Sequence, residues 1–247
     1  MRSFIAAVRF LTRLPMPGAA TTAADLPWAI AWFPFIGALI NATIAGIAVG
    51  LLTWWPAPIA VLLAVVAGLL LTGGFHEDAA SDAADGLGGG VDNERVLAIM
   101  RDSRIGAYGA MALWGMLTFR FLGLLLLMNS NAMLAVVIFS FAGAWGRWSA
   151  GPWLRFLPPL SDGLSKDITS ESRHGPWLCA TLSLVGLSVG CWYLHYPQLL
   201  MSIMVPLAVT VVWGCYLWRR LGGQTGDLLG AGNVLVEASV LLVALTR

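Results

Sequence analysis

The acidic residues of this 247-residue sequence are concentrated in one short segment. Seven of its 13 aspartates and glutamates lie between positions 77 and 102, namely Glu77, Asp78, Asp82, Asp85, Asp92, Glu94 and Asp102. No lysine is interleaved with them, although a solvated helix face normally mixes the two signs. We therefore interpret the segment as a functional site, with a solvated polar face as the alternative.

Three of these carboxylates have a helical spacing. Asp78, Asp82 and Asp85 follow an i, i+4, i+7 pattern, so a helix presents them on one face, while Glu77 points about 100° away. Like charges at this spacing repel each other unless a cation lies against them. A hard divalent cation such as Mg²⁺ prefers oxygen ligands. The small residues between the aspartates would let a bulky substrate approach, so we predict a metal site.

Arginines follow the acidic segment. Asp102 and Arg104 stand directly before an apolar stretch, and Arg147 lies inside another. An arginine binds phosphate through two parallel hydrogen bonds, and a carboxylate-held metal with arginines suits phosphoryl transfer. Arg104 is equally compatible with a positively charged anchor at a helix start. Arg120 is also in an apolar stretch, where we expect a structural role with a carboxylate or carbonyl partner.

A glycine-rich string forms the third polar element. Gly222 and Gly223 would permit close backbone approach to a ligand, and Thr225 and Asp227 could complete a nucleotide or second metal site. A plain turn explains the same string. His76 adjoins the acidic segment, where it could bind substrate, cap the helix or orient a carboxylate.

The composition indicates the elements that position these residues. The sequence is 58% hydrophobic and 11% charged, with mean hydropathy +0.79, whereas soluble domains carry about a quarter charged residues. We expect an all-α, polytopic membrane helix bundle forming one domain over residues 1–247, with about six or seven transmembrane helices. The net charge of +1 offers no argument for nucleic-acid binding. The expected spans are 32–53, 57–74, 106–128, 132–150, 177–195, 199–217 and a shorter one at 234–246.

The loops predict an orientation. Residues 54–58, 129–131 and 195–198 contain no lysine or arginine, whereas the other connections do. The positive-inside rule then places the N-terminus and the polar loops in the cytoplasm, with the acidic segment at that membrane edge. Residues 1–14 suit either an amphipathic surface helix or a helix packed against the bundle. Small residues along the spans would permit a homo-oligomer.

Six strings, in this order along the whole chain, resemble the adenosylcobinamide-GDP ribazoletransferase (cobalamin-5′-phosphate synthase) family. They are FLTRLP at 10–15, WFPFIG at 32–37, LTGGFHED at 71–78, SDAADG at 81–86, IMRDSRIG at 99–106 and GGQTGD at 222–227.

This resemblance implies a multi-pass enzyme of the cell inner membrane with a cytoplasmic active site. Adenosylcobinamide-GDP would react with α-ribazole or its 5′-phosphate, Mg²⁺ would be required and GMP would be released. It implies that Asp78, Asp82 and Asp85 are the metal ligands, with Asp82, Asp85 and Asp102 in catalysis. The implied substrate and phosphate contacts are His76, Arg104, Arg147, Gly222, Gly223, Thr225 and Asp227.

Two positions depart from the sequence pattern of this family. Glu77 stands where we expect an apolar residue, and Glu237 is the only carboxylate of the last helix, because position 234 is valine.

Two other functions compete with this interpretation. A lipid-directed CDP-alcohol phosphotransferase would also use clustered aspartates, but this sequence follows Asp85-Gly86 with no Ala-Arg pair. A transporter would place its polar groups near the bilayer midplane, often in paired repeats, and no repeat is visible.

Overall fold

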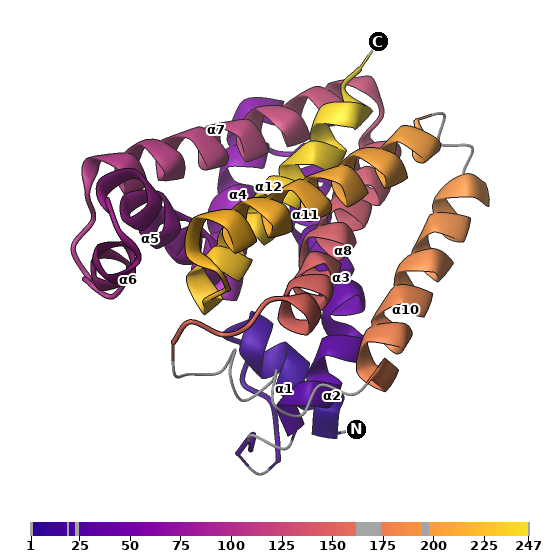
Figure 1. The fold of residues 1–247 in the computed structure, drawn as a ribbon. Coiled ribbons are helices and arrows are strands. Elements are labelled where there is room, and N and C mark those ends of the chain that lie inside the picture. The colour runs from indigo at the N-terminus through magenta and orange to yellow at the C-terminus, as the bar shows by residue number, and fades with distance from the viewer. Residues whose placement is uncertain (1, 19, 23–24, 162–173, 194–197, 247) are drawn as a thin grey trace.

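The computed structural model describes residues 2–18, 20–22, 25–161, 174–193 and 198–246 (Figure 1). Within these ranges every regular element is a helix, which confirms the all-α prediction. The elements are α1 (Arg2–Leu11), α2 (Leu26–Ala29), η2 (Ile30–Trp32), α3 (Phe33–Leu51), α4 (Ala57–Thr72), α5 (Phe75–Gly89), α6 (Asn93–Met100), α7 (Ala107–Ser130), α8 (Ala132–Phe156), α10 (His174–Tyr193), α11 (Leu199–Leu221) and α12 (Gly226–Ala244).

Several helices are long and apolar enough to cross a membrane. Among the described residues these are Leu26–Leu51, Ala107–Ser130, Ala132–Phe156, Leu199–Leu221 and Gly226–Ala244, and the bent pair α4–α5 counts as a sixth if taken together. The apolar part of α10, Gly175–Cys191, is shorter. Positions 194 and 195 of the expected span 177–195 lie outside the described residues. The chain is therefore a multi-pass membrane protein.

The last helix differs from the prediction. It begins at Gly226 rather than at 234 and has 19 residues, enough to cross the bilayer. The side chain of Thr225 accepts a hydrogen bond from Leu228 N at 3.3 Å and so caps its N-terminus. The small and polar residues 226–233 resemble a loop in sequence, but they form the first two turns of α12.

A sharp bend separates α4 from the acidic helix. Gly73 and Gly74 have φ angles of 70° and 67°, in the left-handed region that favours glycine. A Cβ on Gly73 would also lie 2.3 Å from Arg13 Nε. The axes of α4 and α5 consequently differ by 86°. This bend turns the polar helix α5 away from the apolar helix that precedes it.

The core lies where α3, α8 and α12 pack together. Gly37 and Gly143 allow α3 and α8 to approach closely, because a Cβ on Gly37 would lie 2.3 Å from the Gly143 carbonyl oxygen. Helix α1 packs on α2 and α3 with Ala7 and Leu11 fully buried. This contact favours the second prediction for residues 1–14, a helix packed against the bundle.

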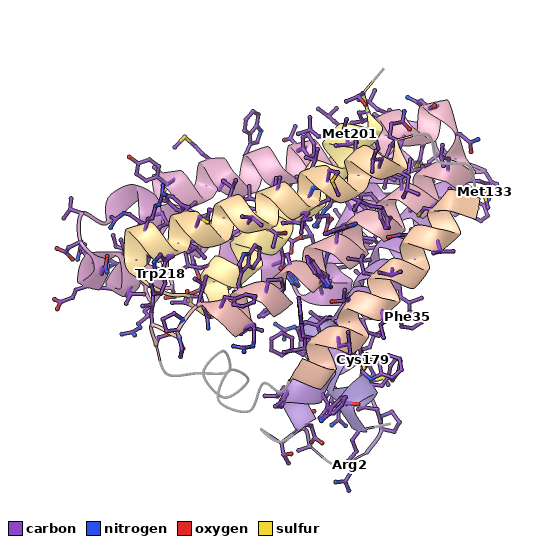
Figure 2. All side chains as sticks on the ribbon, turned by 45° about the vertical axis from the view of Figure 1, so that its right-hand side comes forward. Arg2, Phe35, Met133, Cys179, Met201 and Trp218 are labelled. Carbon is purple, nitrogen blue, oxygen red and sulfur yellow. The ribbon has the colours of Figure 1, made fainter. Side chains whose placement is uncertain are left out.

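The starts of α8 and α11 lie at the same end of the molecule. Figure 2 shows Met133 and Met201 there, while Arg2 and Trp218 lie away from that end. Helices α5 and α6 also lie far from it (Figure 1). The starts of α8 and α11, which follow two of the three neutral connections, thus share one end, and the acidic segment lies away from it. Which compartment each side faces stays a prediction.

Candidate active site

Helix α5 lies between the N-terminal halves of α7 and α12 (Figure 1). A Cβ on Gly230 of α12 would lie 2.5 Å from the Cβ of Ala79, and one on Gly109 of α7 would lie 2.5 Å from Ser81 Oγ. These glycines let both helices approach α5 closely. The acidic helix is therefore held from two sides, which limits the directions in which its carboxylates can point.

The structure brings together carboxylates from two distant segments. Asp78 is exposed, Asp82 is half-buried and Asp227, in the first turn of α12, is half-buried. Asp82 lies within electrostatic range of Asp78, Asp85 and Asp227, and Asp227 lies within range of Asp78. All these interactions are repulsive. Asp227, predicted only as a nucleotide or second-metal residue, thus joins the cluster formed by Asp78 and Asp82, which we call the carboxylate cluster.

Asp85 has a different environment from its two neighbours. Its carboxylate accepts hydrogen bonds from Gly106 N at 2.7 Å and from Gly109 N at 2.8 Å, at the N-terminus of α7. A carboxylate at this position satisfies free amide groups and interacts favourably with the helix dipole. Asp85 is predicted as a metal ligand and catalytic residue, and in the structure each of its oxygens accepts one hydrogen bond that holds α7 against α5.

Whether a metal ion fits this site can be judged from the side chains that would bind it. In the described part of the chain no group of three or more His, Cys, Asp or Glu side chains is placed to hold a metal ion. The predicted ligand set Asp78, Asp82 and Asp85 is therefore not preassembled. The carboxylates of Asp78 and Asp82 nevertheless form no ion pair or hydrogen bond with described residues. With Asp227 they supply only oxygen donors, which suit a hard divalent cation such as Mg²⁺.

Asp102 and Arg104 pair with each other. Arg104 Nη2 lies 2.6 Å from Asp102 Oδ2, and the Arg104 side chain is 86% exposed. Hydrogen bonds from Arg104 lower the pKa of Asp102 to about 2. The charges that shift the pKa of Asp102 are those of Arg104 and Arg95. Asp102 is thus paired with Arg104, and so acidic a group accepts a proton weakly at neutral pH.

Four buried charges form a chain through the bundle. Arg120 of α7 pairs with Glu77 of α5 and, at 3.0 Å, with Glu237 of α12, and Glu237 also pairs with Arg147 of α8. We call these four residues the buried charge network. It confirms the expected structural role of Arg120 and explains Glu77, whose position departs from the family pattern. Arg147, predicted as a phosphate contact, is 3% exposed, and its Nη1 pairs with Glu237, while its Nε has no hydrogen-bond partner among the described residues.

His76 faces this network rather than the carboxylate cluster. Its side chain is buried, and its charged neighbours are Arg147, Glu237 and Arg120. Among the described residues Nδ1 has no hydrogen-bond partner, and no side chain caps the start of α5. The structure thus excludes the capping role and places His76 behind the carboxylate cluster.

The glycine-rich string serves mainly to turn the chain. Gly222 has φ 78° and ends α11, where its amide donates to the carbonyls of Leu217 and Trp218. A Cβ on Gly223 would lie 2.3 Å from the Pro158 carbonyl oxygen. Together with the Thr225 cap, these contacts support the plain-turn alternative for all but Asp227.

Two buried polar residues received no role from the sequence. Gln224 is fully buried, neither side-chain amide atom has a partner among the described residues, and its backbone is fixed by hydrogen bonds with Pro158 and Leu160. Glu237 is the central residue of the buried charge network. An acidic residue within an apolar helix is a signal that could have identified Glu237, whereas a glutamine inside a turn carries no such signal.

Comparison with known proteins identifies relatives over the full chain. A family model described as cobalamin-5-phosphate synthase matches residues 3–245. An adenosylcobinamide-GDP ribazoletransferase of Thiobacillus denitrificans is 34% identical over 246 residues, which cover 99% of this chain and 95% of the relative. Proteins of the same name from Ralstonia nicotianae and Vibrio cholerae are 36% and 34% identical, covering 99% and 98% of this chain and 95% and 92% of those relatives. No solved structure matches the chain.

Proposed function

The chain belongs to the cobalamin-5-phosphate synthase family, and from this membership we propose that it is an adenosylcobinamide-GDP ribazoletransferase. It transfers the adenosylcobinamide-phosphate group to α-ribazole or its 5′-phosphate and releases GMP. The observation that carries the proposal is the match over residues 3–245, which includes every helix of the site. The carboxylate cluster at one end of the bundle supports it, because carboxylates that hold a divalent cation would supply the charge neutralisation that phosphoryl transfer requires.

The reaction is a substitution at phosphorus. A hydroxyl oxygen of the ribazole attacks the phosphorus on the corrinoid side of the diphosphate, and the bond from that phosphorus to the GMP oxygen breaks. GMP leaves with the bonding electron pair, and the hydroxyl proton passes to a base. The half-buried Asp82 is our candidate for this base, since the hydrogen bonds from Arg104 keep the pKa of Asp102 low and make it a weak base.

Asp78, Asp82 and Asp227 are the residues that would hold Mg²⁺. A bound Mg²⁺ would neutralise the charge of the diphosphate. Asp85 keeps the start of α7 against α5, and through it the adjoining Asp102–Arg104 segment. The exposed guanidinium of Arg104 is available to a substrate phosphate once it leaves Asp102.

We place the site on the cytoplasmic side of the cell inner membrane. The argument is the positive-inside rule applied to the connection from α5 to α7, which includes α6 and carries Arg95, Arg101 and Arg104. Both substrates are polar, and the carboxylate cluster lies at an end of the bundle where they could reach it from water.

The test is GMP release by the purified protein in detergent or nanodiscs. Adenosylcobinamide-GDP is supplied with and without α-ribazole 5′-phosphate, first with Mg²⁺ and then with EDTA. We expect release that requires both the acceptor and the metal. Release of CMP from CDP-alcohols, with no GMP from the corrinoid donor, would overturn the substrate assignment and favour the lipid-directed alternative.

A further inference from the structure

A cavity lies directly behind the acidic helix. It has a volume of about 360 Å³, is partly open to the surroundings and is lined by residues of α5, α7, α11 and α12. Small or apolar side chains form most of its wall, including Ala80, Ala84, Gly115, Met116, Leu235 and Ala238. Cavities of this size accommodate small-molecule ligands.

The cavity and the carboxylate cluster lie on opposite faces of α5. Ala80 and Ala84 are each two residues from Asp82, which corresponds to about 200° around a helix. A ligand in the cavity would therefore touch the back of the helix whose front carries Asp78 and Asp82. It would not touch those carboxylates themselves.

The surroundings of the cavity indicate the chemistry of its occupant. Leu235, which lines it, is 45% exposed, and nearby on the same helices Leu242 and Trp114 are 57% and 73% exposed. In a multi-pass protein such apolar surface contacts lipid hydrocarbon. Arg120 also lines the cavity, but Glu77 and Glu237 neutralise it, so no free cation is offered to a phosphate or carboxylate.

We propose that one acyl chain of a membrane lipid occupies this cavity and supports α5 from behind. An empty cavity leaves its lining atoms without dispersion contacts, and the structure around it relaxes only partly. A hydrocarbon chain supplies those contacts without any polar group to satisfy. The position of the catalytic helix then depends on bound lipid. This property goes beyond the proposed transferase activity and does not rest on it.

The test uses phosphatidylcholine that carries a photoreactive diazirine in one acyl chain. The full-length protein is placed in nanodiscs of dioleoylphosphatidylcholine with this probe, irradiated and digested, and adducts are located by mass spectrometry. We expect adducts on the cavity face of α5, at Ala80 and Ala84, as well as on lipid-facing residues such as Trp114. Absence of adducts from α5 while Trp114 is labelled would overturn the proposal.

Gly115→Leu provides the matching variant. A Cβ on Gly115 meets no atom within 4 Å, so a larger side chain can enter the cavity without a clash. We expect loss of the α5 adducts with Trp114 labelling retained. Gly46→Leu in α3, where a Cβ also meets nothing within 4 Å, is the control and should label like the unaltered protein. Ala84→Leu serves as a second filling variant.

The same variants test a competing occupant of the cavity, the ribazole acceptor. If Gly115→Leu raises the KM for α-ribazole 5′-phosphate while the α5 adducts persist, the cavity belongs to the substrate and the lipid proposal is wrong. Because the labelling is read without turnover, it decides the lipid proposal even if the protein proves to have a different activity.

Discussion

Arg120, in the middle of α7, is ion-paired with Glu77 of α5, the residue directly before the first aspartate of the carboxylate cluster. Both side chains are almost fully buried. The helix that carries the predicted metal ligands is therefore attached to the bundle through an ion pair that is almost fully buried. The buried charge network extends this attachment through Glu237 to Arg147, and its two arginines balance its two glutamates.

Removing one member of this network should destabilise the protein more than removing a balanced pair. Arg120→Met leaves two glutamates against Arg147, and an uncompensated buried charge costs about 3–5 kcal/mol. In Glu77→Gln/Arg120→Met the remaining charges balance, so we expect part of that stability to return. Thermal unfolding of both single variants and the double variant in detergent measures the coupling. Strictly additive losses would contradict the interdependence of the two residues.

Asp82→Asn should remove activity without unfolding the protein. The substitution removes a candidate base and metal ligand from a cluster of repelling carboxylates, so we expect GMP release to fall by about 100-fold or more with an unchanged melting temperature. Glu94→Gln, an exposed acidic residue on α6, is the matched control and should retain activity. Full activity of Asp82→Asn would exclude this residue from the chemistry.

Substitution of Asp227 should change the Mg²⁺ requirement of the reaction, whereas substitution of Asp85 should lower the stability of the protein. Asp227→Asn removes a proposed Mg²⁺ ligand, so we expect half-maximal activity to require more Mg²⁺ with little change in stability. Asp85→Ala removes the carboxylate that caps α7, which should cost about 1–2 kcal/mol of stability.

Mg²⁺ titrations of GMP release together with melting curves separate the two effects. A higher Mg²⁺ requirement in a well-folded Asp85→Asn variant would restore Asp85 to the ligand set that its spacing predicted.

Asp102 should not control the pH dependence of the reaction. Its pKa of about 2 means that the carboxylate is already ionised throughout the neutral range. We therefore expect Asp102→Asn to keep the shape of the profile of kcat against pH between about pH 6 and 8. Loss of the acidic limb of that profile in the variant would show that Asp102 moves into the site and acts as the base.

The amino-acid sequence by itself determined the class of the protein and the face of its acidic helix. The apolar stretches predict the spans because an apolar helix crossing lipid satisfies its own backbone, and the i, i+4, i+7 spacing aligns Asp78, Asp82 and Asp85 wherever α5 is placed. The order of the six strings also identified the family, which the match over residues 3–245 confirms.

Only the tertiary structure decided which partners those residues have. Asp85 turns to the N-terminus of α7, Asp227 joins the carboxylate cluster from α12, and Arg147 pairs with Glu237. The physical reason is that helical periodicity relates residues within a turn or two. The meeting of Glu77, Arg120 and Glu237, which are far apart along the chain, depends on how closely small residues let α5, α7 and α12 pack.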